Sequence, residues 1–123
     1  MPKRILVVDD ELDLCKVIAF RLRKEGYDVT VVNDGLEGLN AIRKSSPDLI
    51  VLDLMLPSMS GEEVCKTLRE DDDREDIQNI PIVMLTAKSG VVDKIVGKVI
   101  GANAYLMKPF DVSQLLEEIK RLI

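Results

Sequence analysis

Histidine and tryptophan are absent from this sequence of 123 residues, and cysteine occurs only twice, at Cys15 and Cys65. The absence of histidine excludes a serine–histidine–aspartate triad, a zinc site with histidine ligands and a phosphohistidine on this chain. The two cysteines stand among apolar neighbours in helix-like segments and do not have the spacing of metal ligands. We therefore expect two buried free thiols in a reducing compartment, and no disulfide.

Long apolar runs are also lacking. No stretch reaches the ~18 residues of a membrane-spanning helix, and none near the N-terminus is typical of a signal peptide, so we expect a cytoplasmic protein with no membrane contact. The net charge is −5, whereas nucleic acid binding requires a basic face, so we expect no direct nucleic acid binding by this chain. The length and the apolar content of 46% fit one domain over residues 1–123.

Four short apolar runs are present, and each stops at a polar residue. They are residues 5–8 before Asp9 and Asp10, 49–52 before Asp53, 82–85 before Thr86, and 105–107 before Lys108. Such runs are typical of strands buried on both faces of a parallel sheet. Because parallel strands end at the same edge, we expect the polar residues to meet in one crevice, where open α/β sheets bind ligands.

Helical periodicity separates the strands. The predicted helices cover residues 14–22 (stopped by Gly26), 35–44, the segment capped by Ser60, 91–100, and 112–122, and residues 27–32 alternate like a half-buried edge strand. Strand and helix thus alternate five times, which indicates an α/β fold with a parallel sheet and helices on both faces. The pattern alone leaves the strand order open.

Two segments depart from the regular pattern. The acidic stretch 70–73, followed by residues 74–76, is interpreted as the frayed end of a helix and a solvated loop. The predicted helix over 91–100 contains Gly97 and many β-branched residues, which lower helix propensity. It is interpreted either as an ordinary buried helix or as an element of marginal stability that is able to shift.

The three aspartates would repel one another in a small crevice, by about 4 kcal/mol for a pair ~4 Å apart at an effective dielectric constant of ~20. Magnesium or the ammonium of Lys108 would offset this repulsion. An aspartate beside a metal can act as a nucleophile towards phosphorus, with Thr86 as a hydroxyl donor and the small Ala87 leaving the approach open. The alternative for Asp9 and Asp10 is a helix N-cap.

Five motifs in order give the chain a resemblance to the receiver domains of two-component response regulators, over nearly its whole length. The motifs are Val7-Val8-Asp9-Asp10-Glu11, Asp53-Leu54-Met55-Leu56-Pro57 followed by Gly61, Leu85-Thr86-Ala87, Gly101-Ala102 with Tyr105, and Lys108-Pro109-Phe110. The resemblance implies a flavodoxin-like (βα)5 three-layer sandwich with strand order 2-1-3-4-5, the order of flavodoxin and chemotaxis receivers. It also implies a signalling module and not a turnover enzyme.

The resemblance further implies a role for each site residue. Asp53 would accept a phosphoryl group from a histidine kinase or a histidine phosphotransfer protein in a phosphorelay. Asp10, Asp53 and the backbone carbonyl of Met55 would bind Mg²⁺, with Mn²⁺ as a possible substitute, and Asp9 would assist through water or through a contact with a direct ligand.

The remaining site residues would respond to the phosphoryl group. Lys108 would pair with it, Thr86 would move towards it beside Ala87, and Tyr105 would swing inward; the peptide bond from Lys108 to Pro109 would be cis. The face formed by the helix over 91–100, the strand over 105–107 and the helix over 112–122 would then bind a downstream protein or a second copy of the chain.

Other interpretations remain at this point. A degenerate receiver would act as a phosphorylation-independent protein-binding module. An aspartyl-phosphate phosphatase needs a second aspartate two residues after the nucleophile, where this chain has Met55. A flavodoxin or a P-loop hydrolase would need a phosphate-binding loop that the sequence does not contain. Receivers often carry acidic residues where this chain has Asn103 and Ala104. We expect no effector domain in this chain.

Overall fold

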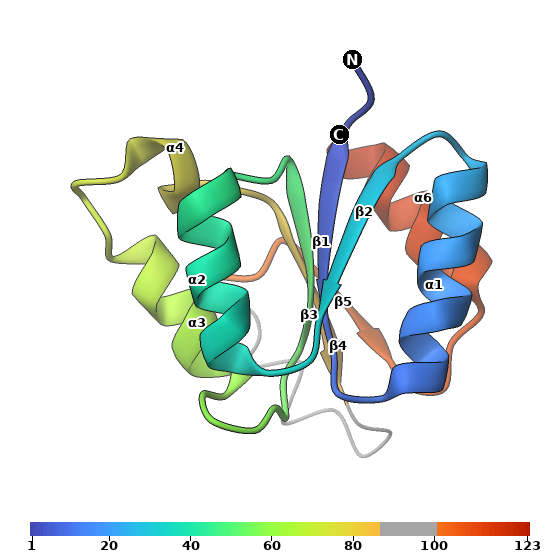
Figure 1. Cartoon of the computed structure of the whole chain (residues 1–123), viewed down its shortest axis with the longest axis horizontal. Coiled ribbons are helices and arrows are strands. Elements are labelled where there is room, and N and C mark those ends of the chain that lie inside the picture. The colour runs from blue at the N-terminus through green and yellow to red at the C-terminus, as the bar shows by residue number, and fades with distance from the viewer. Residues whose placement is uncertain (87–100) are drawn as a thin grey trace.

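A central parallel sheet with helices on both faces organises the molecule (Figure 1). The structure is a computed structural model and describes residues 1–86 and 101–123. The strands are β1 (Arg4–Val8), β2 (Asp28–Val32), β3 (Leu49–Asp53), β4 (Ile82–Thr86) and β5 (Ala104–Met107). Their order is β2-β1-β3-β4-β5 and every neighbouring pair is parallel, which confirms the expected topology.

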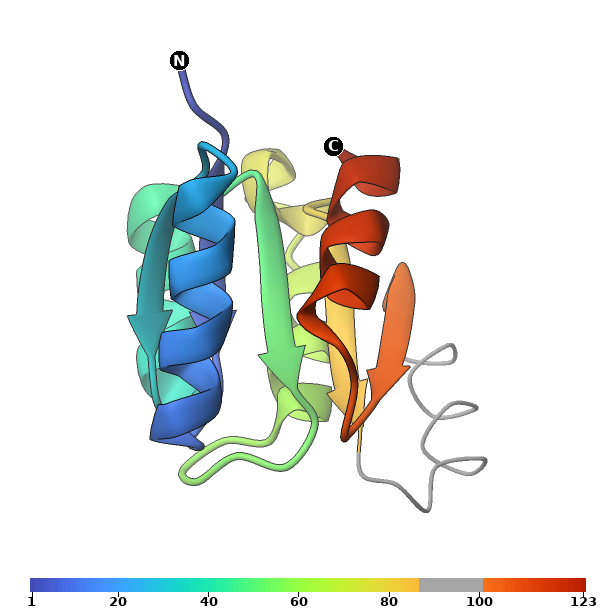
Figure 2. The same cartoon turned by 90° about the vertical axis from the view of Figure 1, so that its right-hand side faces the viewer.

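The described helices form the two outer layers. They are α1 (Leu12–Lys24), α2 (Gly35–Ser45), α3 (Gly61–Arg69), α4 (Glu75–Gln78) and α6 (Val112–Leu122). Helices α1 and α6 cover one face of the sheet, and α2, α3 and α4 cover the other (Figure 1). Viewed at 90°, the strand arrows all point the same way, with β2 and β5 at the two lateral edges (Figure 2).

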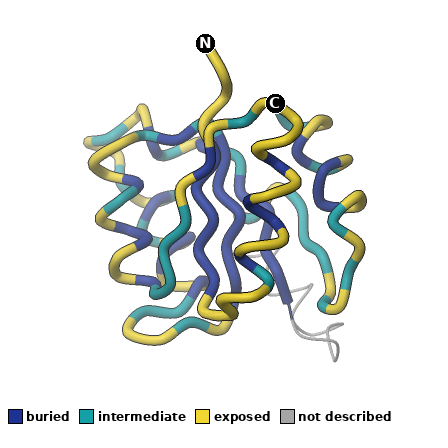
Figure 3. Tube along the Cα trace, turned by 45° about the vertical axis from the view of Figure 1, so that its right-hand side comes forward, coloured by how far each residue is buried: buried dark blue, intermediate teal, exposed yellow. Residues whose placement is uncertain are grey.

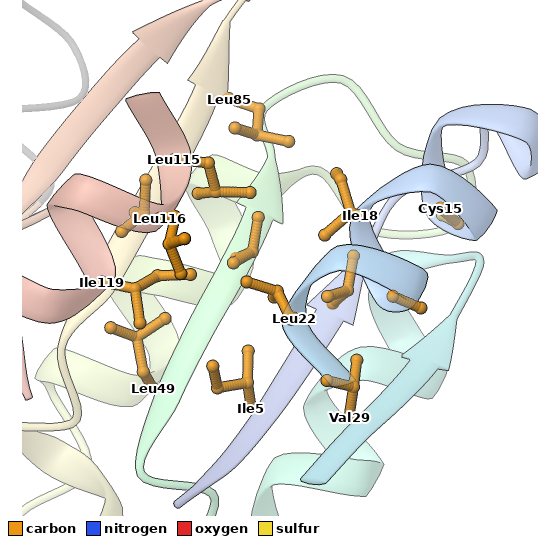
Figure 4. Close-up of a cluster of buried hydrophobic side chains, with 14 residues drawn as sticks. Ile5, Cys15, Ile18, Leu22, Val29, Leu49, Leu85, Leu115, Leu116 and Ile119 are labelled. Atoms are coloured by element: carbon orange, nitrogen blue, oxygen red, sulfur yellow. The ribbon is translucent and has the colours of Figure 1, made fainter. Parts of the chain in front are cut away.

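The core is split by the sheet because side chains alternate along each central strand. On β1, Ile5 and Val7 face the cluster under α1 and α6, whereas Leu6 and Val8 face the cluster under α2 and α3. Strands β3 and β4 divide in the same way, so the three central strands are buried along most of their length (Figure 3). Figure 4 shows side chains of α1 and α6 meeting over the sheet, among them Ile18, Leu22, Leu115, Leu116 and Ile119.

The prediction of full burial is wrong for the last of the four apolar runs. Strand β5 pairs only with β4 among the described strands, and its residues are half-buried, with Met107 38% exposed. An apolar run of three residues does not distinguish a central strand from an edge strand, and the position of β5 in the sheet decides its exposure. The expected edge strand β2 is confirmed by its pairing with β1 alone and by its mixed burial.

Local sequence signals set most helix ends. The side chains of Asp34 and Ser60 accept hydrogen bonds from the backbone N–H groups of Glu37 and Glu63, and so cap α2 and α3. After α1, Gly26 adopts a φ of +96°, a left-handed conformation that favours glycine. The predicted helices therefore match the structure to within a few residues at these ends.

The acidic segment after α3 contains one element that the sequence interpretation did not include. Residues 75–78 form the short helix α4, whereas the segment 70–76 was interpreted as the frayed end of a helix and a solvated loop. Its single fully buried residue, Ile77, packs into the cluster under α2 and α3. Burial of one apolar side chain thus folds a turn of helix in a segment whose charge pattern indicates a loop.

Three further expectations concern the cysteines, membrane-spanning helices and the segment between β4 and β5. Cys15 and Cys65 are both buried free thiols, as expected. No described helix is long and apolar enough to cross a bilayer; the cytoplasmic location stays a prediction. The predicted helix over 91–100 and the expected site residue Ala87 lie outside the described residues.

Candidate functional site

The carboxyl edge of the sheet gathers the polar residues that follow the strands. The register aligns Val8 with Leu52, Asp53 with Leu85, and Thr86 with Met107, so the strands end nearly level with one another. The expected convergence at one edge is thereby present, although the residues come from positions 9 to 108 of the chain (Figure 2).

Three carboxylates form the centre of the site. Asp9, Asp10 and Asp53 each offer a carboxylate oxygen, and these atoms all lie within 4.8 Å of one another. Asp9 is fully buried and Asp53 is 6% exposed, whereas Asp10 is exposed to solvent. The cluster therefore has an inner wall made of Asp9 and Asp53 and an open side at Asp10, through which a small ligand can enter.

Lys108 is the cation of the site and lies among three carboxylates. Its Nζ donates hydrogen bonds to Oδ2 of Asp53 at 3.2 Å and to Oε1 of Glu11 at 2.9 Å. It also lies 2.9 Å from Oδ2 of Asp9, as an ion contact without hydrogen-bond geometry. Glu11 is a site residue that the sequence interpretation quoted only as part of a motif, because no local pattern shows that residues 97 positions apart meet.

Burial and the neighbouring charges together shift the pKa values of Asp53 and Lys108. Burial, followed by the negative charge of Asp9, raises the pKa of Asp53 to about 6, although Lys108 works against the shift. Burial alone would lower the pKa of Lys108, but its contacts with Glu11, Asp9 and Asp53 outweigh burial and raise the pKa above the ordinary lysine value. Near neutral pH the site therefore holds a charged ammonium of Lys108 beside an Asp53 carboxylate that is mostly ionised.

Asp9 is held by its backbone as well as by its side chain. The backbone carbonyl of Asp9 accepts hydrogen bonds from Nδ2 of Asn33 at 2.9 Å and from Sγ of Cys15 at 3.3 Å. Its backbone N–H donates to the carbonyl of Val32 at 3.2 Å. Asn33 and Cys15 are thus supporting residues that sequence reasoning missed, since both act through contacts with the backbone of a distant or buried neighbour.

The donor set fits a divalent metal ion. Oδ2 of Asp9 is buried and accepts no hydrogen bond from the described residues, although the ammonium of Lys108 lies 2.9 Å away, so its hydrogen-bonding capacity is unsatisfied. Three carboxylates, those of Asp9, Glu11 and Asp53, contact the ammonium of Lys108, and Asp10 adds a fourth carboxylate to the cluster. Hard oxygen ligands and excess negative charge suit Mg²⁺, which would satisfy both needs.

Beside the carboxylates, the loop after β3 contributes backbone groups. The N–H of Met55 donates to Oδ1 of Asp53 at 3.3 Å, and the Met55 side chain is 71% exposed. The N–H of Gly61 donates to the carbonyl of Leu54 at 2.9 Å, and a Cβ at position 61 would lie 2.1 Å from the carbonyl oxygen of Asp53. Glycine at this position therefore allows the start of α3 to pack directly against the end of β3.

Thr86 and Tyr105 lie on the β4–β5 side of the site. Thr86 is fully buried, and its hydroxyl donates a long hydrogen bond of 3.5 Å to the carbonyl of Leu106. Tyr105 is half-buried and packs against the cluster under α2 and α3. The peptide bond between Lys108 and Pro109 is cis, the isomer that the resemblance implies.

Comparison with known proteins decides the family. The model of the response regulator receiver domain matches residues 5–120 of the chain. The chain belongs to the response regulator receiver family. It is a receiver domain with an acidic pocket formed by Asp9, Asp10, Asp53 and Lys108, and therefore a signalling module and not a turnover enzyme. A receiver implies a histidine kinase as partner.

Relatives of this receiver include longer proteins. It is 46% identical over 120 residues to the DNA-binding response regulator MtrA of Mycolicibacterium paratuberculosis, covering 98% of this chain and 51% of that protein. The receiver thus spans about half the length of the curated relatives it matches.

Solved structures of other receivers have the same fold. A putative response regulator from Chloroflexus aurantiacus superimposes with a TM-score of 0.92 at 35% identity, covering 99% of this chain and 98% of that one. The receiver domain of the sensor histidine kinase PA1611 from Pseudomonas aeruginosa superimposes with a TM-score of 0.87 at 31% identity, covering 99% and 98%. That structure is described with a magnesium ion coordinated in the active site cleft.

Proposed function

We propose that Asp53 is the phosphoacceptor of this receiver in a magnesium-dependent phosphorelay. The donor would be a histidine kinase or a histidine phosphotransfer protein. The observation that carries the proposal is the contact of Lys108 Nζ with Oδ2 of Asp53 at 3.2 Å, at the only one of the three clustered aspartates that ends a central strand of the sheet. Asp53 is thus held beside a fixed positive charge at an open edge of the sheet.

The proposed reaction is an in-line transfer at phosphorus. An oxygen of the ionised Asp53 carboxylate attacks the phosphorus, a new O–P bond forms, and the bond from phosphorus to the donor nitrogen breaks. The donor nitrogen keeps the bonding electron pair, and the imidazole of the donor is regenerated. Lys108 neutralises part of the charge on the phosphoryl oxygens, the kind of electrostatic stabilisation that phosphoryl transfer needs.

The proposed metal ligands are Asp10, Asp53 and the backbone carbonyl of Met55. Asp9 assists through water or through contact with a direct ligand, and the unsatisfied Oδ2 of Asp9 supports this arrangement. Bound Mg²⁺, for which Mn²⁺ can substitute, supplies positive charge to the phosphoryl oxygens. The magnesium described in the receiver of PA1611 supports the choice of metal.

The proposed response begins at β4 and β5. The hydroxyl of Thr86 moves from Leu106 towards the phosphoryl group and Tyr105 swings inward, while the sequence alone, with its small Ala87 side chain, predicts an open approach to the site. The weak hydrogen bond of 3.5 Å from Thr86 supports its release. The changed face would comprise β5, α6 and the predicted helix over 91–100, and would bind a downstream protein or a second copy of the chain.

We propose that contacts with DNA, if the whole protein makes them as MtrA is described to do, lie outside this receiver. The net charge of −5 supports this division, because a binding face for phosphates must be basic. Within the described residues, the site concentrates acidic side chains and would repel a nucleic acid backbone.

The test of the phosphoacceptor is direct labelling. The receiver is incubated with Mg²⁺ and acetyl phosphate, and intact mass spectrometry measures the added phosphoryl group. Asp53→Asn should abolish the added mass because the amide is not a nucleophile for this reaction. The matched control Asp28→Asn removes an exposed carboxylate at the amino end of β2, away from the site at the carboxyl edge, and should label like the wild type.

Three results would contradict the assignment. Equal labelling of Asp53→Asn would place the acceptor elsewhere. A wild-type receiver that takes no label from acetyl phosphate or from a phosphorylated histidine phosphotransfer protein would favour the degenerate receiver that binds partners without phosphorylation. Catalytic turnover on an added phosphorylated substrate would favour the aspartyl-phosphate phosphatase.

A further inference from the structure

Lys108 has one more carboxylate partner than the reaction at Asp53 requires. Besides Asp53 and Asp9, its ammonium donates to Oε1 of Glu11 at 2.9 Å, which is shorter than its 3.2 Å hydrogen bond to Asp53. The Lys108 side chain is 17% exposed, so most of its hydration has been replaced by these contacts. Before any phosphoryl group arrives, the ammonium thus donates to Glu11 and Asp53 and lies in ion contact with Asp9.

The three partners differ in how readily they can give up the ammonium. The Asp9 side chain is 0% exposed and the Asp53 side chain is 9% exposed, whereas the Glu11 side chain is 59% exposed. A carboxylate that leaves an ion pair needs water as a replacement partner, because an unpaired buried charge is costly. Of the three carboxylates, only that of Glu11 is largely exposed to solvent, so Glu11 is the partner that Lys108 can release at low cost in free energy.

The backbone of Glu11 is anchored while its side chain remains free to rotate. Its N–H donates to Oδ1 of Asp9 at 2.9 Å, and its carbonyl accepts the N–H of Cys15 at 3.0 Å as the first hydrogen bond of α1. The side chain of Glu11 makes no capping bond at this helix start. Rotation of the Glu11 side chain away from Lys108 therefore leaves α1 and Asp9 in place.

We propose that Glu11 is a positioning residue that holds Lys108 in the unphosphorylated receiver and releases it to the phosphoryl group on Asp53. This proposal rests on the proposed function of Asp53. Glu11 competes with the incoming phosphoryl oxygens for the same ammonium. The free energy of its exposed ion pair with Lys108 is therefore added to the barrier to phosphorylation, and the rate falls accordingly. Removal of its charge makes Lys108 available earlier.

The experiment compares phosphorylation rates of Glu11→Gln with those of the wild type. Glutamine keeps the size of the side chain and loses its charge. The rates are measured at saturating Mg²⁺, at a concentration found by titrating each variant. The rate of label incorporation should rise about two- to five-fold, the change that corresponds to the free energy of an exposed ion pair. The matched control Asp13→Asn removes an exposed carboxylate two residues further along, which forms no ion pair with Lys108 in the described structure.

Two phosphodonors of different charge separate competition for Lys108 from simple repulsion of the donor. Repulsion by Glu11 would slow the more negative acetyl phosphate more than phosphoramidate, and its removal would favour acetyl phosphate selectively. Competition for Lys108 is independent of the donor. We expect the same acceleration with both donors, and none for Asp13→Asn with either.

A double-mutant cycle tests whether Glu11 acts through Lys108. In a Lys108→Ala background, which labels more slowly, the substitution Glu11→Gln should have no effect on the rate. A role of Glu11 in the general stability of α1 would leave the effect unchanged in that background. Thermal unfolding of each variant checks that the fold is retained.

Several outcomes would overturn the proposal: an unchanged or slower rate in Glu11→Gln, an acceleration confined to acetyl phosphate, an equal acceleration in Asp13→Asn, or an effect that persists in Lys108→Ala. Failure of the proposed function is a different result, since the wild type would then take no label at Asp53 at all. Labelling of the wild type with no difference for Glu11→Gln rejects only the role of Glu11.

Discussion

Lys108 and Arg69 are two cations drawn into opposite edges of the same sheet, and their surroundings differ in kind. At the carboxyl edge, Lys108 lies among the carboxylates of Asp9, Glu11 and Asp53. At the amino edge, the guanidinium of Arg69 donates to the carbonyls of Gly101 and Gln78 and to the side-chain oxygen of Asn103, at 2.8–3.0 Å. These three acceptors of Arg69 are all neutral.

The pKa shifts reflect this difference. Burial lowers the pKa of Arg69, and none of the three groups that accept its hydrogen bonds is a carboxylate that would counteract this shift. Burial also lowers the pKa of Lys108, but its carboxylate contacts reverse the sign of the shift. The amino edge is thus complete in its hydrogen bonds, whereas the carboxyl edge carries surplus negative charge and an Asp9 oxygen that accepts no hydrogen bond from the described residues. The contacts of Arg69 at the amino edge stabilise the fold, whereas the excess carboxylates at the carboxyl edge form the reactive site.

The largest expected effect comes from breaking the complete edge. Arg69 ties α3 to the end of α4 and to the residues before β5, and Asn103 in turn accepts the N–H of Ile82 at 2.9 Å. Arg69→Ala should lower the free energy of unfolding by about 2–3 kcal/mol, because three acceptors lose a charged donor. Urea denaturation with and without Mg²⁺ measures the loss.

The control for this prediction is Lys66→Ala, an exposed lysine one turn earlier on α3. It should change the free energy of unfolding by less than about 0.5 kcal/mol. The loss in Arg69→Ala should be equal with and without Mg²⁺. A loss that disappears when Mg²⁺ is added would show that the two edges are coupled and would remove the distinction between them.

A pH series without divalent metal sharpens the comparison at the carboxyl edge. The pKa of Asp53 is about 6 in the fold against 3.8 for an ordinary aspartate. Between these values the unfolded chain has released the proton while the folded chain retains it, so stability falls as the pH rises through this window. This shift corresponds to about 3 kcal/mol, and solvent screening reduces the expected cost of the ionised Asp53 to about 2 kcal/mol above pH 6.

Asp53→Asn supplies the neutral reference for this measurement. With a chelator present, the stability of this variant relative to the wild type should be similar near pH 4, should increase up to about pH 6 and should then level off. A difference that is constant across the whole range would contradict a raised pKa at Asp53. Added Mg²⁺ should abolish the advantage of the variant.

Asp10→Asn should give the smallest effect. Asp10 is exposed and belongs to the carboxylate cluster, so its neutralisation relieves repulsion in a well-hydrated position. The midpoint of denaturation without metal should rise by the equivalent of up to about 1 kcal/mol. Affinity for Mg²⁺, measured by titration calorimetry, should fall about tenfold or more. An unchanged midpoint together with unchanged affinity would contradict the role of Asp10 in the cluster.

The reactive edge was more predictable from the sequence than the complete edge. Asp53, Thr86 and Lys108 each follow an apolar run, and the parallel sheet brings strand ends together whatever the residues between them. Helix caps at Asp34 and Ser60 are local signals as well. The strand order, in contrast, came from a family resemblance, because alternation of strands and helices does not encode which strands are neighbours.

The contacts that the sequence did not predict are those between distant side chains and backbone groups. Asn33 on the backbone of Asp9, Glu11 on Lys108, and Arg69 on Gly101 have no periodicity or spacing that indicates them. The short helix α4 was missed for a related reason, since the burial of Ile77 depends on a hydrophobic cluster built by other elements. Tertiary packing decides these features after the local pattern is set.

The close contact of Gly61 with the carbonyl of Asp53 also bears on how this chain can change over generations. A methyl group at position 61 would meet backbone atoms of Asp53 and Leu54 at 2.1–2.9 Å, and backbone cannot rotate aside as a side chain can. Any residue other than glycine at position 61 would therefore force the start of α3 away from the end of β3. Descendants of this chain that replace Gly61 would therefore have to rebuild the junction between β3 and α3 as well.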